Sequence, residues 1–287
     1  MARPPKRKYY SSREGVEGLK SSFDLSDLRR HFFSTFKELD SLDYCNEHFG
    51  THCVDVGNIS GTLGTDIKGA ILLILKRQNV WPFEAHYSSW NEAELFDVIE
   101  FVFDHVSKPM EEGATYHDWG ECGWHYIKFD GIAGQELFRK KINLMLEEYE
   151  IGYTLSSKGE VQTLGNEYLR PIFEAEVLTD DDTLRQKVDF AVSKFRRHNA
   201  SVEDRLLAVR DLADVLERLR PKFKEVLNKK DDTALFDIAN RFGIRHFNSS
   251  QNLNYDKNIW SSWMFYFYLS TIHAGLRFLE KEQSQTT

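Results

Sequence analysis

The sequence SVEDRLLAVRDLADVLE, residues 201–217, decides the fold of the second half of the chain. Ser201 and Asp204 stand at the spacing of a capping box, which starts an α-helix, and Pro221 is expected to end it. The apolar residues recur at intervals of three and four, which places them on one face of that helix. They are Leu206, Val209, Leu212, Ala213, Leu216 and Leu219.

Helical patterns of the same kind occupy most of the remaining chain, so the fold class is expected to be mainly α. Two stretches, 43–64 and 110–130, have no helical period and are interpreted as loops. The helices are expected from Asp24 or Ser26 to about Leu39, over 65–78 as a buried helix, and over 91–106, 133–149, 182–198, 231–239 and 258–282.

One segment changes to a period of two. Residues 152–164 alternate apolar and polar side chains around Ser157-Lys158-Gly159, which predicts a small β-hairpin near a domain boundary. The expected organisation is a basic flexible tail, an N-terminal helical domain, the hairpin with its linker, a C-terminal helical bundle and a disordered tail. Their bounds are 1–20, 21–150, 151–165, 166–282 and 283–287.

Composition favours a globular protein of the cytoplasm. The chain has 287 residues, 41% of them apolar, which is enough for one large core or two smaller ones. Three cysteines cannot build a disulfide framework and suit a reducing compartment. The basic start MARPPKRK has no apolar run after it, so no leader is expected. Polar residues interrupt the aromatic segment 258–279, which is therefore expected to be a buried helix and not a membrane span.

The net charge of −8 is unevenly distributed. Residues 181–287 contain 18 Lys and Arg against 15 Asp and Glu, so the acidic excess belongs to residues 1–180. Basic clusters decide where a protein binds nucleic acid, which directs attention to the C-terminal part. The alternative is that this excess is ordinary surface variation.

Two groups of cysteines and histidines have spacings close to those of zinc ligands. Neighbouring His52 and Cys53 cannot easily point at one ion, and structural zinc usually takes paired ligands from two turns. Ordinary packing is therefore favoured, and no metal or other cofactor is expected. The two groups are Cys45-x2-His48-x3-His52-Cys53, and His117 with Cys122-x2-His125.

The strongest candidate for chemistry is the polar sequence NRFGIRHFN, residues 240–248, between two apolar helices. His246 is a candidate general acid and base, because histidine titrates near neutrality. Arg241 is a candidate for stabilising a phosphorane, because its planar guanidinium binds phosphate through two hydrogen bonds. A helix break at Gly243 would let the two converge. Arg245, Asn248 and Asn240 are then candidate auxiliary or substrate-binding residues. The structural alternative is that Arg241 caps a helix and His246 makes a buried contact.

The segments 201–217 and 235–246, together with the final helix that contains Trp260-Ser-Ser-Trp263, resemble the HEPN superfamily and bacterial abortive-infection proteins of phage defence. The resemblance covers about residues 180–282. It implies a helical bundle that forms a homodimer and cleaves RNA without metal, through an Arg-x4–6-His motif matched by Arg241 and His246. The family usually has a polar residue after the arginine, where this chain has Phe242.

Two functions follow. The first is a metal-independent RNA endonuclease, a toxin-like effector that the N-terminal domain or a regulatory partner protein restrains or triggers. The second is a non-catalytic HEPN-like module for dimerisation or docking, in which Arg241 and His246 are structural.

Overall fold

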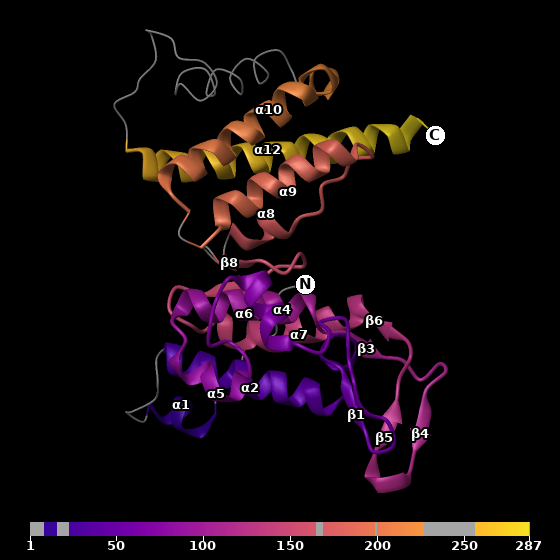
Figure 1. Cartoon of the computed structure of the whole chain (residues 1–287). Helices are drawn as coiled ribbons and strands as arrows, with labels where there is room; N and C mark the ends of the chain where they lie inside the picture. Colours follow the sequence, from indigo (N-terminus) through magenta and orange to yellow (C-terminus); the bar gives the residue numbers. More distant parts are fainter. Residues whose placement is uncertain (1–8, 16–22, 165–168, 199, 227–255, 287) are drawn as a thin grey trace. The chain divides into compact units, whose positions relative to one another are not determined.

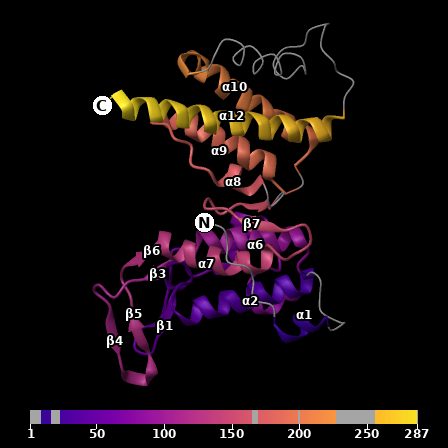
Figure 2. The same ribbon diagram turned by 180° about the vertical axis from the view of Figure 1, so that it is seen from behind.

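The computed structural model describes residues 9–15, 23–164, 169–198, 200–226 and 256–286. The chain is mainly helical, as the periodicity predicted, with a few two-stranded sheets (Figures 1 and 2). It divides into two compact units, Met1–Gly159 and Glu160–Thr287.

Three helices carry the core of the first unit: α2 (Leu25–Ser41), α6 (Glu92–Asp104) and α7 (Gly131–Leu146). Each packs against the other two, and their buried side chains are mainly Phe, Leu, Ile and Val. The predicted start of α2 at Asp24 is confirmed, since Asp24 and Asp27 form a reciprocal capping box. The shorter helices and turns of this unit are α1 (Tyr10–Glu14), α3 (Asn46–Phe49), α4 (Ile67–Leu75), α5 (Phe83–His86) and η1 (Tyr87–Ser89).

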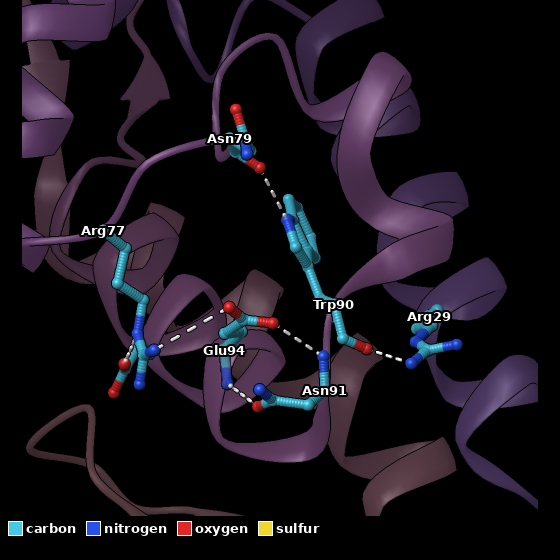
Figure 3. Close-up of polar contacts among 7 residues, drawn as sticks. Arg29, Arg77, Asn79, Trp90, Asn91 and Glu94 are labelled. Atoms are coloured by element: carbon cyan, nitrogen blue, oxygen red, sulfur yellow. Dashed lines mark hydrogen bonds and ion pairs between the residues drawn. The ribbon is translucent and has the colours of Figure 1, made fainter.

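Polar contacts fix the start of α6 (Figure 3). Asn91 and Glu94 exchange hydrogen bonds between side chain and backbone, which caps the helix. Just before them, the Trp90 indole donates to the Asn79 carbonyl at 3.1 Å, and the Arg29 guanidinium donates to the Trp90 carbonyl. Arg77 adds an ion pair to Glu94 at 3.8 Å. These contacts tie α6 to α2 and to the segment after α4.

Both segments interpreted as loops contain short strands. Within 43–64, β1 (Thr51–Cys53) pairs antiparallel with β2 (Gly57–Ile59). Within 110–130, β4 (Thr115–His117) pairs antiparallel with β5 (Gly123–His125), and the 3₁₀ turn η2 (Trp119–Glu121) joins them. β3 (Lys108–Pro109) pairs with β6 (Phe129–Asp130). β1, β4 and β5 lie at the same end of the unit in both views (Figures 1 and 2). Strands of two or three residues are too short to show a period.

The predicted hairpin is present. β7 (Tyr153–Leu155) and β8 (Val161–Thr163) form a two-stranded sheet, and the turn between them contains Gly159 at φ +83°. A positive φ is readily adopted only by glycine, which explains the turn.

The second unit, described by itself, is a helical bundle. Its helices are α8 (Arg170–Glu174), α9 (Asp182–Arg196), α10 (Val202–Val226) and α12 (Lys257–Thr286). α10 packs along both α9 and α12. A β-carbon on Gly275 of α12 would lie 2.2 Å from the Phe223 ring of α10, so this glycine lets the two helices approach closely. The bundle therefore has its own continuous apolar core.

Two predictions about element bounds and burial are wrong. α10 does not end at Pro221 but continues to Val226, because Phe223, two residues after the proline, packs in the core. The predicted buried helix 65–78 is α4, in which Ile71 alone is buried and Leu73 is 70% exposed. The helix α1 lies within residues 1–20, and α12 extends to Thr286.

In the part of the chain that the structure describes, no helix is both long and apolar enough to cross a membrane.

Candidate metal centre

The β4–β5 hairpin places two histidines on one of its faces. His117 lies opposite Gly123 and His125 lies opposite Thr115, whereas Tyr116 and Trp124 face each other one position away. Because successive side chains of a strand alternate between faces, both imidazoles share one face and the aromatic pair occupies the other. The hairpin register therefore brings two nitrogen ligands together.

The third group is Cys53, the last residue of β1. The chain turns back after it through Val54, Asp55 and Val56 to Gly57, whose φ is +81°. The backbone N–H groups of Asp55 and Val56 donate to the Cys53 sulfur, which is the main cause of a lowered pKa of this thiol. Hydrogen bonds to sulfur favour the thiolate, and the thiolate is the form that binds metal.

The fourth group is Cys122, which follows η2. The turn is built on Gly120 at φ +63° and Gly123 at φ +86°. A β-carbon on Gly120 would lie 3.0 Å from Val54, so the turn packs directly on the residue after Cys53. Two segments far apart in the sequence therefore meet through their ligand-bearing turns.

Cys53, His117, Cys122 and His125 each offer a ligand atom, and these four atoms lie within 4.8 Å of one another. The Cys53 sulfur is 3.8 Å from His117 Nδ1, and the Cys122 sulfur is 3.1 Å from His125 Nε2. Tetrahedral zinc, with Zn–S of about 2.3 Å and Zn–N of about 2.05 Å, separates S and N ligands by about 3.6 Å. The observed separations bracket that value, so the group fits a tetrahedral ion of this size.

A carboxylate stands behind one of the ligands. His117 turns Nδ1 toward Cys53, and its Nε2 lies 3.0 Å from Asp55 Oδ2. When Nδ1 binds a metal, Nε2 carries the proton and donates it to the carboxylate. Carboxylate, histidine and metal in this order are usual at protein zinc sites, where the carboxylate fixes the orientation and tautomer of the imidazole.

The other cysteine and histidines of the two sequence groups take no part. His52 Nδ1 lies 3.0 Å from Asn58 Oδ1 across the β1–β2 hairpin, and His48 Nδ1 lies 2.7 Å from Thr62 Oγ1. Cys45 is fully buried, and burial, with a contribution from Asp40, raises its pKa. Ordinary packing, expected for both groups, describes these three residues.

For the remaining four residues, the grouping in the fold differs from the grouping by sequence spacing. Sequence spacing grouped Cys53 with Cys45, His48 and His52, whereas the fold groups it with His117, Cys122 and His125. The signal in the sequence was His-x4-Cys-x2-His at 117–125, with Gly120 and Gly123 beside the cysteine. It lacked only one ligand from elsewhere in the chain.

Arg241, His246 and the auxiliary candidates Asn240, Arg245 and Asn248 lie outside the residues that the structure describes, as does the predicted helix 231–239.

Comparison of the chain with protein-family models, curated proteins and solved structures gives no match.

Proposed function

We propose that the first unit binds one Zn²⁺ ion through Cys53, His117, Cys122 and His125, and that the ion holds the β1–β2 and β4–β5 hairpins together. The observation that carries this proposal is the convergence of four ligand atoms within 4.8 Å from segments 64 residues apart. Two thiolates with two imidazoles form a donor set typical of zinc.

The number of protein ligands assigns the ion a structural role. Catalytic zinc keeps one coordination position for water or substrate, whereas four protein ligands close the tetrahedron. The helices α2, α6 and α7 have a core of their own, so loss of the ion is expected to loosen the hairpins and leave this core folded. Hydrogen exchange should then increase over residues 51–59 and 115–125 after chelation, with little change in α6.

The metal content of the purified full-length chain tests this proposal. Elemental analysis after dialysis against a weak chelator is expected to give one zinc per chain, and His125→Ala or Cys122→Ala should remove it. Two matched controls, His52→Ala and Cys45→Ala, change the same residue types nearby in the sequence and should retain the zinc. A metal-free chain, or zinc retained by both ligand variants, would contradict the proposal.

The second proposal is RNA cleavage by the second unit, with His246 as general acid and base and Arg241 stabilising the phosphorane. It rests on the resemblance to HEPN ribonucleases, and the packed helices α9, α10 and α12 support it, because a helical bundle is what that family implies. The motif lies in sequence between α10 and α12. RNA as substrate, a homodimer formed through this unit, and a regulatory partner in phage defence are parts of the same proposal.

A single-stranded RNA of mixed sequence, incubated with the zinc-loaded chain, tests the nuclease. We expect cleavage that His246→Ala and Arg241→Ala abolish and that His198→Ala, another histidine of this unit, leaves intact. The zinc centre affects how a chelator experiment is interpreted, because EDTA would also loosen the first unit. The variant His125→Ala separates the effects: cleavage that persists in it is independent of the proposed metal. Equal behaviour of intact protein and motif variants would favour the non-catalytic interaction module.

A further inference from the structure

Two of the four ligands are cysteines, and they differ in accessibility. Cys53 is 5% exposed, whereas Cys122 is only partly buried. The third cysteine of the chain, Cys45, is fully buried and outside the cluster. A dissolved oxidant therefore reaches Cys122 first, and the thiol nearest to it within the same cluster is Cys53.

The turn around Cys122 has room to adjust. Gly120 and Gly123 flank the cysteine at positive φ, and its sulfur contacts Cys53, His125 at 3.1 Å and the His52 carbonyl at 3.8 Å. The two sulfurs lie within 4.8 Å of each other, and a disulfide needs about 2.05 Å. The difference is a small movement for a glycine-flanked turn.

We propose that Cys122 is a site of oxidation by hydroperoxides and that Cys53 resolves it, so that a Cys53–Cys122 disulfide replaces the metal. This inference rests on the proposed zinc centre and assigns its regulation.

The chemistry balances in two steps. The Cys122 thiolate attacks hydrogen peroxide, the O–O bond breaks, and sulfenic acid and hydroxide form. The Cys53 thiolate then attacks the sulfenic sulfur, an S–S bond forms, and a second hydroxide leaves. The two thiolates lose two electrons and one peroxide gains them, and two protons from the acid form of the buffer convert both hydroxides to water. The ion loses two of four ligands and dissociates, because two imidazoles alone bind zinc weakly.

The two states link the hairpins differently. With the ion bound, all four ligands are fixed by coordination, and Asp55 is fixed by its hydrogen bond with His117. With the disulfide, the ends of β1 and η2 stay joined while His117 and His125 are released. In a reducing compartment thiols restore the first state, so the modification is reversible.

The experiment adds hydrogen peroxide stepwise to the zinc-loaded full-length chain. Zinc release is followed with a chromogenic chelator, and non-reducing peptide mapping identifies the disulfide. We expect one zinc released per disulfide formed, a Cys53–Cys122 peptide pair, and recovery of metal binding after reduction with dithiothreitol and added zinc. Cys45→Ala should behave like the unchanged chain. Cys122→His offers an imidazole in place of the thiolate and cannot form the disulfide; once its zinc content is measured before peroxide is added, it should release at least a tenfold smaller fraction of that zinc at the same peroxide dose.

Three results would overturn the inference: zinc release with sulfinic acid in place of a disulfide, a disulfide that includes Cys45, or equal release from Cys122→His. The zinc content of the chain, measured before peroxide is added, tests the zinc proposal separately. A chain without zinc at that point overturns the zinc proposal and the displacement of metal with it. A zinc-loaded chain without the disulfide overturns only the inference.

Discussion

His117 presents Nε2 to Asp55 Oδ2 at 3.0 Å, while Nδ1 of the same ring lies 3.8 Å from the Cys53 sulfur. One imidazole thus connects a carboxylate to the ligand cluster. Asp55 belongs to the turn whose backbone N–H groups donate hydrogen bonds to the Cys53 sulfur. This one short turn therefore supports two of the four ligands, Cys53 and His117.

Replacing this carboxylate should weaken zinc binding and leave the ligands in place. For Asp55→Asn we expect a 10- to 100-fold loss of affinity, the usual effect of removing a carboxylate behind a metal-bound histidine. Competition with a chelator of known affinity measures it. Asp118→Asn is the matched control, because Asp118 is an exposed carboxylate directly after His117. The zinc affinity of this variant should not change. Equal losses in both variants would mean that net charge, not orientation, is responsible.

Alkaline pH should destabilise the first unit through two buried tyrosines. Burial, followed by the nearby Glu92 and Glu150, raises the pKa of Tyr153 from 10.0 to about 12, and the pKa of Tyr149 is raised by the same causes. A raised pKa in the folded state means that these tyrosines keep their protons to a higher pH in the folded chain than in the unfolded chain. The stabilisation is therefore complete below pH 10 and is lost as the pH rises toward 12.

Urea unfolding at several alkaline pH values, with tyrosinate absorbance, measures this loss. Tyr149 donates to Glu92 Oε2 at 2.6 Å, and the carboxylate disfavours a tyrosinate beside it. Glu92→Gln should lower the pKa of both tyrosines and flatten the dependence of stability on pH above 10. Glu84→Gln, in α5, serves as the control for a lost carboxylate. An unchanged slope in Glu92→Gln would exclude this pair as the cause.

Gly275→Ala should destabilise the second unit. The new β-carbon would lie 2.2 Å from the fully buried Phe223 ring, so ring or helix must move, at a cost of about 1–3 kcal/mol in the free energy of unfolding. Denaturant unfolding gives the value. Gly131→Ala, where a β-carbon meets nothing within 4 Å, should be neutral or stabilising. Adding Phe223→Leu to Gly275→Ala should recover part of the loss if the clash causes it.

Pro221→Ala should stabilise the same unit. Pro221 is exposed and lies inside α10, where its ring removes one backbone hydrogen bond and crowds the preceding turn. Alanine restores that bond. It also makes the unfolded chain more flexible, which offsets part of the gain, so the free energy of unfolding should rise by about 1–2 kcal/mol. A higher melting temperature of the second unit is the expected readout. An unchanged or lower value would show that the proline fits α10 without strain.

Most helices could be predicted from the sequence because each signal is local. α2 and α6 combine an apolar period with a capping box, and both signals lie within one or two turns of the helix. The end of α10 could not be predicted, because Pro221 signals a stop locally and the packing of Phe223 on α12 overrides it. The burial of α4 was wrong for a similar reason: an apolar run shows what a helix can bury but not whether a neighbour covers it.

The candidate metal centre likewise combines a local signal in the sequence with a tertiary contact. The sequence could place His117, Cys122 and His125 in one group, because they lie within nine residues. It could not add Cys53, because that pairing depends on β1 lying beside the β4–β5 turn, which is a tertiary contact. Short strands with glycines at positive φ gave no period to detect. By spacing alone, the neighbouring His52 is as good a candidate ligand as Cys53, although its Nδ1 lies 3.0 Å from Asn58 Oδ1 instead.

The separation of Cys53 from the other ligands also orders events during synthesis of the chain. Cys53 leaves the ribosome 64 residues before His117, and at about 5–20 residues per second the delay is several seconds. During that interval a metal ion has only one native ligand to bind. The centre can therefore close only after the β4–β5 turn has emerged, so bound zinc would record that this part of the polypeptide has been translated and folded.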